Sequence, residues 1–444
     1  MKNNGCIINF IINAEWPQLP DKVRHQSKRC FLDTLGALIA GHKTPVADLM
    51  TSFAAAQFRG NESSILVKGN KLSASGAALV NGFANNALDI DDGYRLTKGH
   101  PGACVLPVAL SVGEMLPEVT GENFLTALVV GYEVGIRAGL IRHATYETYH
   151  SSGSWGAIGG AAVAGKLMGL SSEKLLNALG AAEYHAPIAP MMKCIGFPGM
   201  GKDSIGWGCM VAVMSAFMAN AGFTGINPIF DDSPKTEWIN SLGHSYEMMN
   251  LYFKPHACCR WAQPGVDGAL KIMSENTIDI DNIETIKVST FKESAALSCG
   301  YPKNTEEAQY NITFPIAAVL LDKEVGPRQV LAPRLFDKDI QKIMDKITIV
   351  AQEKFQKEFP VKAESEVKIT TLTGQLFSSG VMSARWDIHS TLPTDQELED
   401  KFLWLVSPVL GKSNATALKN LVMNFNQEKN LDKLINLCTH QKED

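Results

Sequence analysis

Residues 87–107 have the sequence Ala-Leu-Asp-Ile-Asp-Asp-Gly-Tyr-Arg-Leu-Thr-Lys-Gly-His-Pro-Gly-Ala-Cys-Val-Leu-Pro, with charged side chains of both signs between two apolar stretches. We expect a helix that ends in three carboxylates, then a loop with a tyrosine, two basic residues and a histidine: Asp89, Asp91, Asp92, Tyr94, Arg95, Lys98 and His100. A second apolar helix follows, and helix N-termini attract anions. The segment predicts a binding site for a small anion or, alternatively, a solvated turn that only caps the second helix.

The same pattern of apolar helices continues on both sides of this segment. Hydrophobic residues recur at helical spacing in seven ranges: 21–41, 72–88, 103–116, 122–141, 154–168, 172–183 and 204–221. Many of these ranges carry glycine in their middles, which costs a helix about 1 kcal/mol relative to alanine. Close packing between helices must compensate this cost, so we predict a dense helical domain with buried central helices.

The composition changes near residue 263. Alternating apolar and polar residues predict strands at 286–290 and 346–350, and a hairpin at 367–372 and 375–381 around Thr373 and Gly374. Thr394 and Glu397 have the spacing of a capping box that opens a helix. The chain has 444 residues, more than one core usually supports. We predict a mainly α protein with an all-helical domain at 1–262 and 405–444, and an α+β lid at 263–404.

Charge and cysteine usage narrow the class of protein. The net charge is −5 and basic residues form no run, which argues against nucleic acid or an anionic membrane as a partner. The nine cysteines are odd in number and scattered without CxxC spacing, which favours free thiols in a cytoplasmic protein. No metal-binding motif, dinucleotide fingerprint or phosphate loop is present, so we expect neither a metal nor a cofactor.

Three further segments carry candidate functional residues. His150 precedes a serine- and glycine-containing helix start, and Lys202 precedes the apolar stretch at 204–221. Arg260 lies at the junction of the two compositional regions and can pair with a carboxylate. The alternatives are an exposed loop histidine, and a solvated lysine beside an N-cap at Asp203.

Four stretches in one order along the chain resemble the MmgE/PrpD family: 10–16 with 31–36, 87–107, 165–170, and 253–261. This family includes 2-methylcitrate dehydratase, cis-aconitate decarboxylase and iminodisuccinate epimerase. The resemblance implies a helical domain built from both chain ends, a smaller α+β lid, a homodimer, and an active site between domain and lid that uses no metal or cofactor.

The resemblance also implies roles for particular residues. Residues of the decarboxylase branch match Asp89, His100 and His150, and its lysine matches Lys202, with Lys193 as the competitor. Two positions depart from that branch: Gly93 stands where it has threonine, and Phe314 where it has a lid tyrosine, with Tyr310 one turn earlier.

We therefore expect a cofactor-independent lyase, a dehydratase or decarboxylase, that moves a proton next to a carboxylate of a small di- or tricarboxylic acid. Asp89, His100, His150 and Lys202 are the predicted catalytic residues. The predicted substrate-binding residues are Tyr94, Arg95, Lys193, Arg260 and Tyr310. An epimerase of a small amino- or imino-dicarboxylate is the first alternative, and a non-catalytic carboxylate-binding protein is the second.

Overall fold

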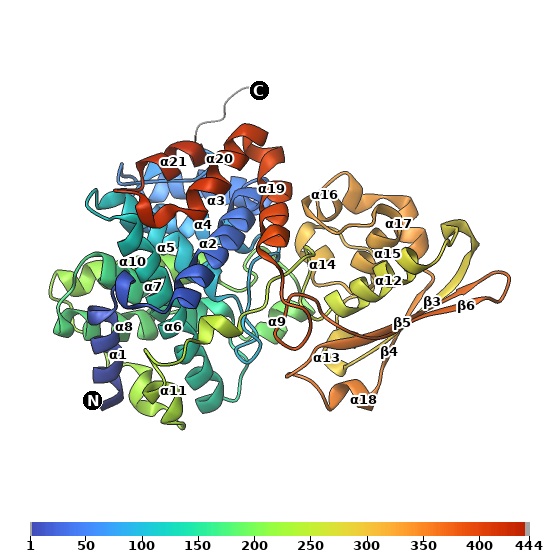
Figure 1. Cartoon of the computed structure of the whole chain (residues 1–444), viewed down its shortest axis with the longest axis horizontal. Coiled ribbons are helices and arrows are strands. Elements are labelled where there is room, and N and C mark those ends of the chain that lie inside the picture. Colours follow the sequence, from blue (N-terminus) through green and yellow to red (C-terminus); the bar gives the residue numbers. More distant parts are fainter. Residues whose placement is uncertain (1, 440–444) are drawn as a thin grey trace.

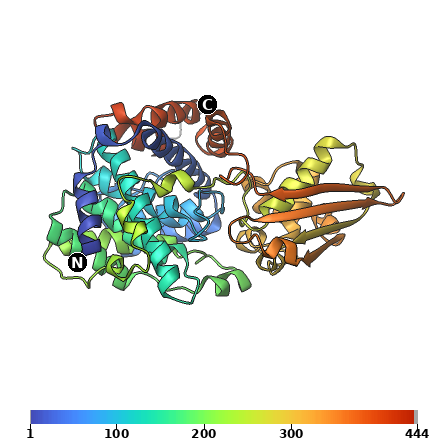
Figure 2. The same ribbon diagram turned by 60° about the horizontal axis from the view of Figure 1, so that its bottom comes forward.

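The computed structural model describes residues 2–439 and consists of two lobes (Figure 1). One lobe is helical and holds both ends of the described range, and the other is a smaller lid that combines helices with a sheet. Figure 2 shows the lid standing beside the helical lobe, connected to it by a few segments. The predicted fold class, mainly α with an α+β lid, is confirmed.

Buried helices form the centre of the helical domain. They are α2 (Asp21–Gly41), α4 (Ala74–Asn86), α5 (Pro101–Met115), α6 (Gly121–Thr145), α7 (Ser152–Leu167) and α10 (Ile205–Asn220). Each lies within a few residues of its predicted range. The expected close approach is seen where α6 meets α7: a Cβ atom on Gly159 would lie 2.8 Å from the Cα atom of Gly135. Glycine is thus required for the packing that offsets its poor helix propensity.

Shorter elements cover this core. They are α1 (Lys2–Asn13), α3 (Pro45–Gln57), α8 (Ser172–His185), α9 (Met191–Gly196), α11 (Glu237–Asn240), and the two-residue strands β1 (Ser63–Ser64) and β2 (Lys71–Leu72). Within residues 2–439, α6 is the one helix long and apolar enough to cross a membrane by length and composition. Its apolar part is completely buried among other helices, as is usual for a core helix.

The lid is built on a four-stranded sheet with the order β4-β3-β5-β6. The strands are β3 (Ile283–Thr290), β4 (Ile347–Ala351), β5 (Glu364–Thr371) and β6 (Leu376–Ser383). β3 and β4 are parallel, whereas β5 pairs antiparallel with both β3 and β6. The lid helices are α12 (Gln263–Glu275), α13 (Lys292–Ala295), α14 (Thr305–Gln309), α15 (Thr313–Asp322), α16 (Pro327–Val330), α17 (Lys338–Met344) and α18 (Glu353–Gln356). Both predicted strands and the predicted hairpin are present.

The chain returns to the helical domain through α19 (Asp395–Leu410), followed by α20 (Lys412–Met423) and α21 (Asp432–Thr439). The predicted capping box of Thr394 and Glu397 opens α19. The boundary expected at residue 405 falls inside this continuous helix. Lys401 already reaches the helical core, where its Nζ atom lies 2.5 Å from Asp33 Oδ1 and 2.7 Å from the carbonyl oxygen of Ile90. Residues 395–404 therefore lie with the helical domain.

Candidate functional site

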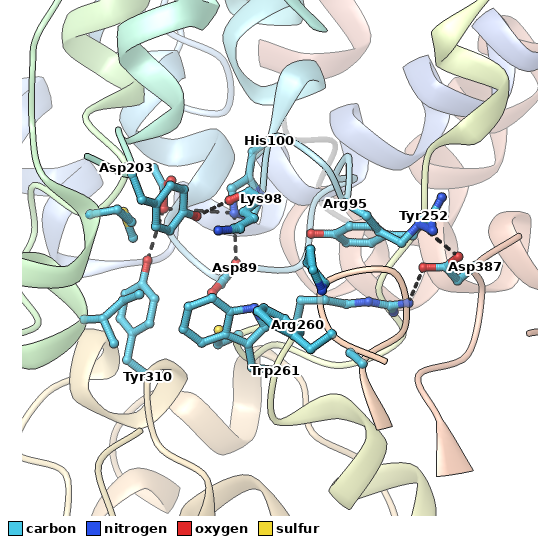
Figure 3. Close-up of a pocket in the computed structure, with 17 residues that line it drawn as sticks. Asp89, Arg95, Lys98, His100, Asp203, Tyr252, Arg260, Trp261, Tyr310 and Asp387 are labelled. Carbon is cyan, nitrogen blue, oxygen red and sulfur yellow. Dashed lines mark hydrogen bonds and ion pairs between the residues drawn. The ribbon is translucent and has the colours of Figure 1, made fainter. Parts of the chain in front are cut away.

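A pocket lies where the loop after α4, the helix α9 and the lid meet (Figure 3). Charged and aromatic side chains dominate its wall, which consists of Asp89, Arg95, Lys98, His100, Tyr149, Met191, Ile195, Asp203, Tyr252, Cys259, Arg260, Trp261, Tyr310, Phe359, Pro360, Ala363 and Asp387. Two halves can be distinguished in Figure 3. One half contains Asp89, His100 and Asp203, and the other contains Arg95 and Asp387.

Asp89 enters the pocket from a strained backbone position. Its φ angle is +51°, a left-handed conformation that is uncommon for a residue with a side chain. The carboxylate forms a hydrogen-bonded ion pair with Lys254, whose side chain is 0% exposed. Burial opposes ionisation of Asp89, but Lys254 and Lys202 prevail and hold its pKa well below the usual range. Asp89 is therefore a fixed anion, and the solvated-turn alternative is wrong for this loop.

His100 stands at the N-terminus of α5 with carboxylates on both sides of its ring. Its Nδ1 atom lies 3.0 Å from Asp91 Oδ2, and its Nε2 atom lies 3.5 Å from Asp89 Oδ1 and 4.0 Å from Asp203 Oδ2. Burial lowers the pKa of His100, but Asp91 and Asp203 raise it, and the net pKa is above the ordinary value. These carboxylates therefore favour the protonated form of the imidazole ring, whose Nε2 atom faces Asp89 and Asp203 in the pocket.

Asp203 joins the helical domain to the lid. Its Oδ1 atom accepts a hydrogen bond of 2.9 Å from the Ser152 hydroxyl, and its Oδ2 atom accepts one of 3.1 Å from the Tyr310 hydroxyl. The N-cap of α10 is Ser204, which has a left-handed backbone and no capping side chain. Asp203 therefore does not cap α10, and Lys202 is 7% exposed, so the alternative of a solvated lysine beside an N-cap at Asp203 is wrong.

The other half of the pocket is built around one carboxylate and two arginines. Arg260 Nη2 lies 2.8 Å from Asp387 Oδ2, and Arg95 Nε lies 3.3 Å from Asp387 Oδ1. The Arg260 guanidinium also lies over the Tyr252 ring, 4.3 Å from its centre, which is a cation–π contact. Arg260 is thus fixed by the protein in two directions.

Five of the nine predicted site residues line this pocket: Asp89, Arg95, His100, Arg260 and Tyr310. The pocket brings them together from both domains, although their spacing in the chain reaches 221 residues between Asp89 and Tyr310. Their roles in catalysis and binding stay predictions, because a pocket alone identifies no reaction.

The other four predicted residues lie outside the described pocket lining. Lys202 is buried behind it, where its Nζ atom donates hydrogen bonds of 2.6 Å to the Asn86 carbonyl and to Gln309 Oε1. Its competitor Lys193 is exposed on α9. Of the two lysines, Lys202 is the one close to the site.

Tyr94 and His150 are also placed away from the pocket wall. The Tyr94 hydroxyl donates a hydrogen bond of 2.5 Å to Glu247. His150 is 4% exposed and packs against the rings of His143 and Tyr146. Burial and the neighbouring Arg142 lower the pKa of His150, which favours a neutral ring.

The two departures from the decarboxylase pattern have structural counterparts. Gly93 lies against the Tyr252 ring, and a Cβ atom at this position would be 2.3 Å from the Tyr252 hydroxyl oxygen. Phe314 is fully buried in α15, whereas Tyr310 projects into the pocket. Tyr252 therefore fills space that a side chain at position 93 would otherwise occupy.

Sequence reasoning did not identify Lys254, Asp203 or Asp387 as site residues. Lys254 lies inside the stretch at 253–261 that carries the resemblance, so its position gave a signal, but nothing in the sequence shows its burial. For Asp203, the sequence indicates only a helix cap. Asp387 lies in the segment between β6 and α19, far from every quoted stretch, and only the fold brings it to Arg95.

Comparison with known proteins matches nearly the whole chain. The MmgE/PrpD N-terminal domain model matches residues 6–245, and the MmgE/PrpD C-terminal domain model matches residues 256–427. The cis-aconitate decarboxylase of Homo sapiens is 26% identical over 92% of this chain and 88% of its own length. A cis-aconitate decarboxylase-like protein of Aspergillus oryzae is 23% identical over 98% and 96%, and the cis-aconitate decarboxylase of Aspergillus terreus is 21% identical over 97% and 94%. With both domain models matched in order across the two lobes, the chain belongs to the MmgE/PrpD family of enzymes.

Proposed function

We propose that this enzyme is a cofactor-independent carboxy-lyase for a small unsaturated carboxylic acid. The observation that carries the proposal is the position of His100, a buried imidazole between the carboxylates of Asp89, Asp91 and Asp203, which raise its pKa and favour its protonated form. Decarboxylation replaces a carboxylate by a proton, so the reaction requires an acid at the carbon that receives this proton. The similarity to cis-aconitate decarboxylases supports the same reaction class.

In the proposed reaction, electrons move from the breaking carbon–carbon bond toward a second carboxylate of the substrate. In an acid with its carboxylate one saturated carbon away from a double bond, the carbon–carbon bond to that carboxylate breaks and CO2 leaves. The electron pair shifts through the double bond onto a carbon next to a second carboxylate and delocalises into it. Lys98 and Arg260 line the pocket and can stabilise the added negative charge. His100 Nε2 then delivers the proton, which the ring recovers from water.

Dehydration and epimerisation fit these side chains less well, because both reactions require a base as well as an acid. His150, the other histidine among the predicted catalytic residues, is outside the described pocket lining. Asp89 is held by Lys254, which makes its carboxylate a weak base. These two reactions and the non-catalytic alternative are therefore outcomes of the test below rather than parallel proposals.

We propose metal-free chemistry because the carboxylates that could bind a metal ion are already paired with cations of the protein. Within residues 2–439, Asp89, Asp91 and His100 are the group close enough together to hold a metal ion. Lys254 already pairs with Asp89, and His100 pairs with Asp91, so the positive charges that these carboxylates require come from the protein. A bound cation would have to displace Lys254 from a fully buried ion pair.

The test is proton NMR of the purified enzyme in D2O with small unsaturated acids, including cis-aconitate. We expect one carbon to be lost as CO2 and one deuterium to be incorporated. His100→Gln removes the acid with little change in size, and we expect a loss of about 10²–10⁴-fold in turnover with intact folding. Water loss or α-carbon exchange without CO2 release would contradict the carboxy-lyase assignment and favour a dehydratase or an epimerase respectively. A folded protein that turns over none of these acids would contradict it in favour of the non-catalytic carboxylate-binding alternative.

We also propose that the enzyme is a homodimer. Large apolar side chains are exposed on α9, on α10 and on the segment between them, where Met192, Phe197, Trp207 and Met214 are 46%, 86%, 42% and 40% exposed. Such clustering is typical of an interface. Light scattering should give twice the chain mass, and Phe197→Glu should give monomers; a monomeric wild-type protein would contradict the proposal.

A further inference from the structure

We propose that Asp387 occupies the place of a substrate carboxylate and that the enzyme consequently selects dicarboxylates over tricarboxylates. The inference rests on the proposed function only in taking this pocket as the substrate site. Cis-aconitate, named for the relatives, carries three carboxylates, so the proposal assigns this chain a substrate with one carboxylate fewer.

Asp387 is paired with two arginines of the pocket wall. Its two oxygens are divided between two arginines, with Oδ2 on Arg260 at 2.8 Å and Oδ1 on Arg95 at 3.3 Å. A substrate carboxylate would be held by two converging guanidinium groups in the same manner. The guanidinium groups that the sequence predicts for substrate binding are therefore already paired with an anion of the protein.

Asp387 is also held in this position by its surroundings. Its side chain is 6% exposed, and the backbone amide of His389 donates a hydrogen bond of 3.1 Å to Oδ1. The preceding residue, Trp386, accepts a hydrogen bond of 3.0 Å from the Phe253 amide and donates one of 2.8 Å to the Thr391 carbonyl. A carboxylate on a backbone segment anchored on both sides competes strongly with an incoming ligand carboxylate.

The charge of the pocket wall limits how many carboxylates a ligand can carry. Three basic side chains and three aspartates line the pocket, in addition to His100. The positive charge of Lys254 balances Asp89, and that of His100 balances Asp91. Three positive charges then remain in the pocket wall, on Arg95, Lys98 and Arg260. Only two aspartates of the wall, Asp203 and Asp387, remain to balance them. With Lys202 behind the wall, the excess positive charge matches two carboxylates, and a third would be buried without a cation.

The space beside Asp387 is occupied by side chains of the protein. Tyr252 lies under Arg260, and its ring approaches Gly93 so closely that no side chain fits there. The Asp387 end of the pocket is thus filled by an aromatic ring and a carboxylate of the protein. Lys98 and His100 lie in the other half of the pocket, beside Asp89 and Asp203, and can contact a ligand there.

The experiment compares two saturated acids that lack the double bond needed for decarboxylation. Propane-1,2,3-tricarboxylate and 2-methylsuccinate differ in one carboxymethyl group, which is a methyl group in the second acid. We expect wild-type enzyme to bind 2-methylsuccinate at least about tenfold more tightly in calorimetry, since a buried charge without a partner costs at least that much. Equal or tighter binding of the tricarboxylate would overturn the proposal without any variant.

Asp387→Asn keeps the shape of the side chain and removes its charge. We expect this variant to shift the ratio of the two dissociation constants at least about tenfold toward the tricarboxylate. Asp339→Asn removes a carboxylate that is 66% exposed on the lid and should leave the ratio unchanged. An unchanged ratio in Asp387→Asn would overturn the role of Asp387. These binding ratios are independent of turnover, so failure of CO2 release would count against the carboxy-lyase proposal alone.

Discussion

The Nδ1 atom of His100 lies 3.0 Å from Asp91 Oδ2, and this contact sets the charge of the imidazole ring in the pocket. Burial alone would lower the pKa of His100 and leave the ring neutral, whereas the Asp91 carboxylate raises that pKa above its ordinary value. An acid that delivers a proton is present below its pKa and is lost as the pH rises through it. The alkaline limb of activity should therefore lie above about pH 6.5.

Asp91→Asn should move this limb to lower pH by about one to two units, because the nearest stabilising charge is gone while the burial remains. The measurement is kcat/KM against pH for both proteins. Asp92→Asn is the control in the same loop. Burial raises the pKa of Asp92 to about 7, and its carboxylate bonds the Gly102 amide and the Tyr132 hydroxyl instead of His100. If the alkaline limb of the pH profile moved in Asp92→Asn but stayed fixed in Asp91→Asn, Asp91 would not be the group that sets the pKa of His100.

Lys254→Met should destabilise the protein by about 3–5 kcal/mol, because it leaves the buried carboxylate of Asp89 without its partner. Urea unfolding measures this loss. The double variant Lys254→Met, Asp89→Asn should recover most of the stability but none of the activity. If the single and double variants were equally unstable, the ion pair would not be the source of the loss.

Gly93→Ala should cost about 1–3 kcal/mol of stability and reduce activity, since its Cβ atom would overlap the Tyr252 ring. Tyr252→Ala in the same chain removes the overlapping ring, so the two substitutions should be strongly non-additive. Thermal unfolding of the two single variants and the double variant gives this coupling. Simple additivity would show that the ring moves aside without cost.

Tyr310→Phe should loosen the lid, because the Tyr310 hydroxyl donates to Asp203 across the junction of the two lobes. We expect faster hydrogen exchange of the amides of α14 and weaker binding of substrate. Tyr301→Phe is the matched control on the lid, because the Tyr301 hydroxyl donates a hydrogen bond to Asp345 and the residue is 46% exposed. Equal exchange rates in both variants would show that this hydrogen bond does not hold the lid.

The helices and the hairpin could be predicted because their apolar spacing is local. α2 begins at Asp21 and ends at Gly41 as its sequence indicates, and the capping box of Thr394 fixes the start of α19. The site was only partly predictable. Asp89 and His100 stand in one short loop, whereas Asp387 reaches Arg95 across 292 positions of the chain. No local pattern reports such a contact.

Burial was the other quantity that the sequence could not supply. Lysine side chains are usually exposed, yet Lys254 is 0% exposed and neutralises the Asp89 carboxylate. Asp203 has the spacing of a helix cap, and only the approach of Tyr310 from the lid reveals another arrangement. In both cases the local sequence favours the common outcome, and tertiary packing decides otherwise.

The insertion of the lid between two parts of the helical domain has a consequence for synthesis on the ribosome. Asp33 and the carbonyl of Ile90 are partnered by Lys401, which is translated only after the whole lid. Until α19 leaves the exit tunnel, Asp33 lacks its ion-pair partner Lys401, and the loop that carries Asp89 lacks one of its supports. The nascent chain must therefore hold an incomplete N-terminal lobe while the lid folds, and the pocket between the two lobes is assembled last.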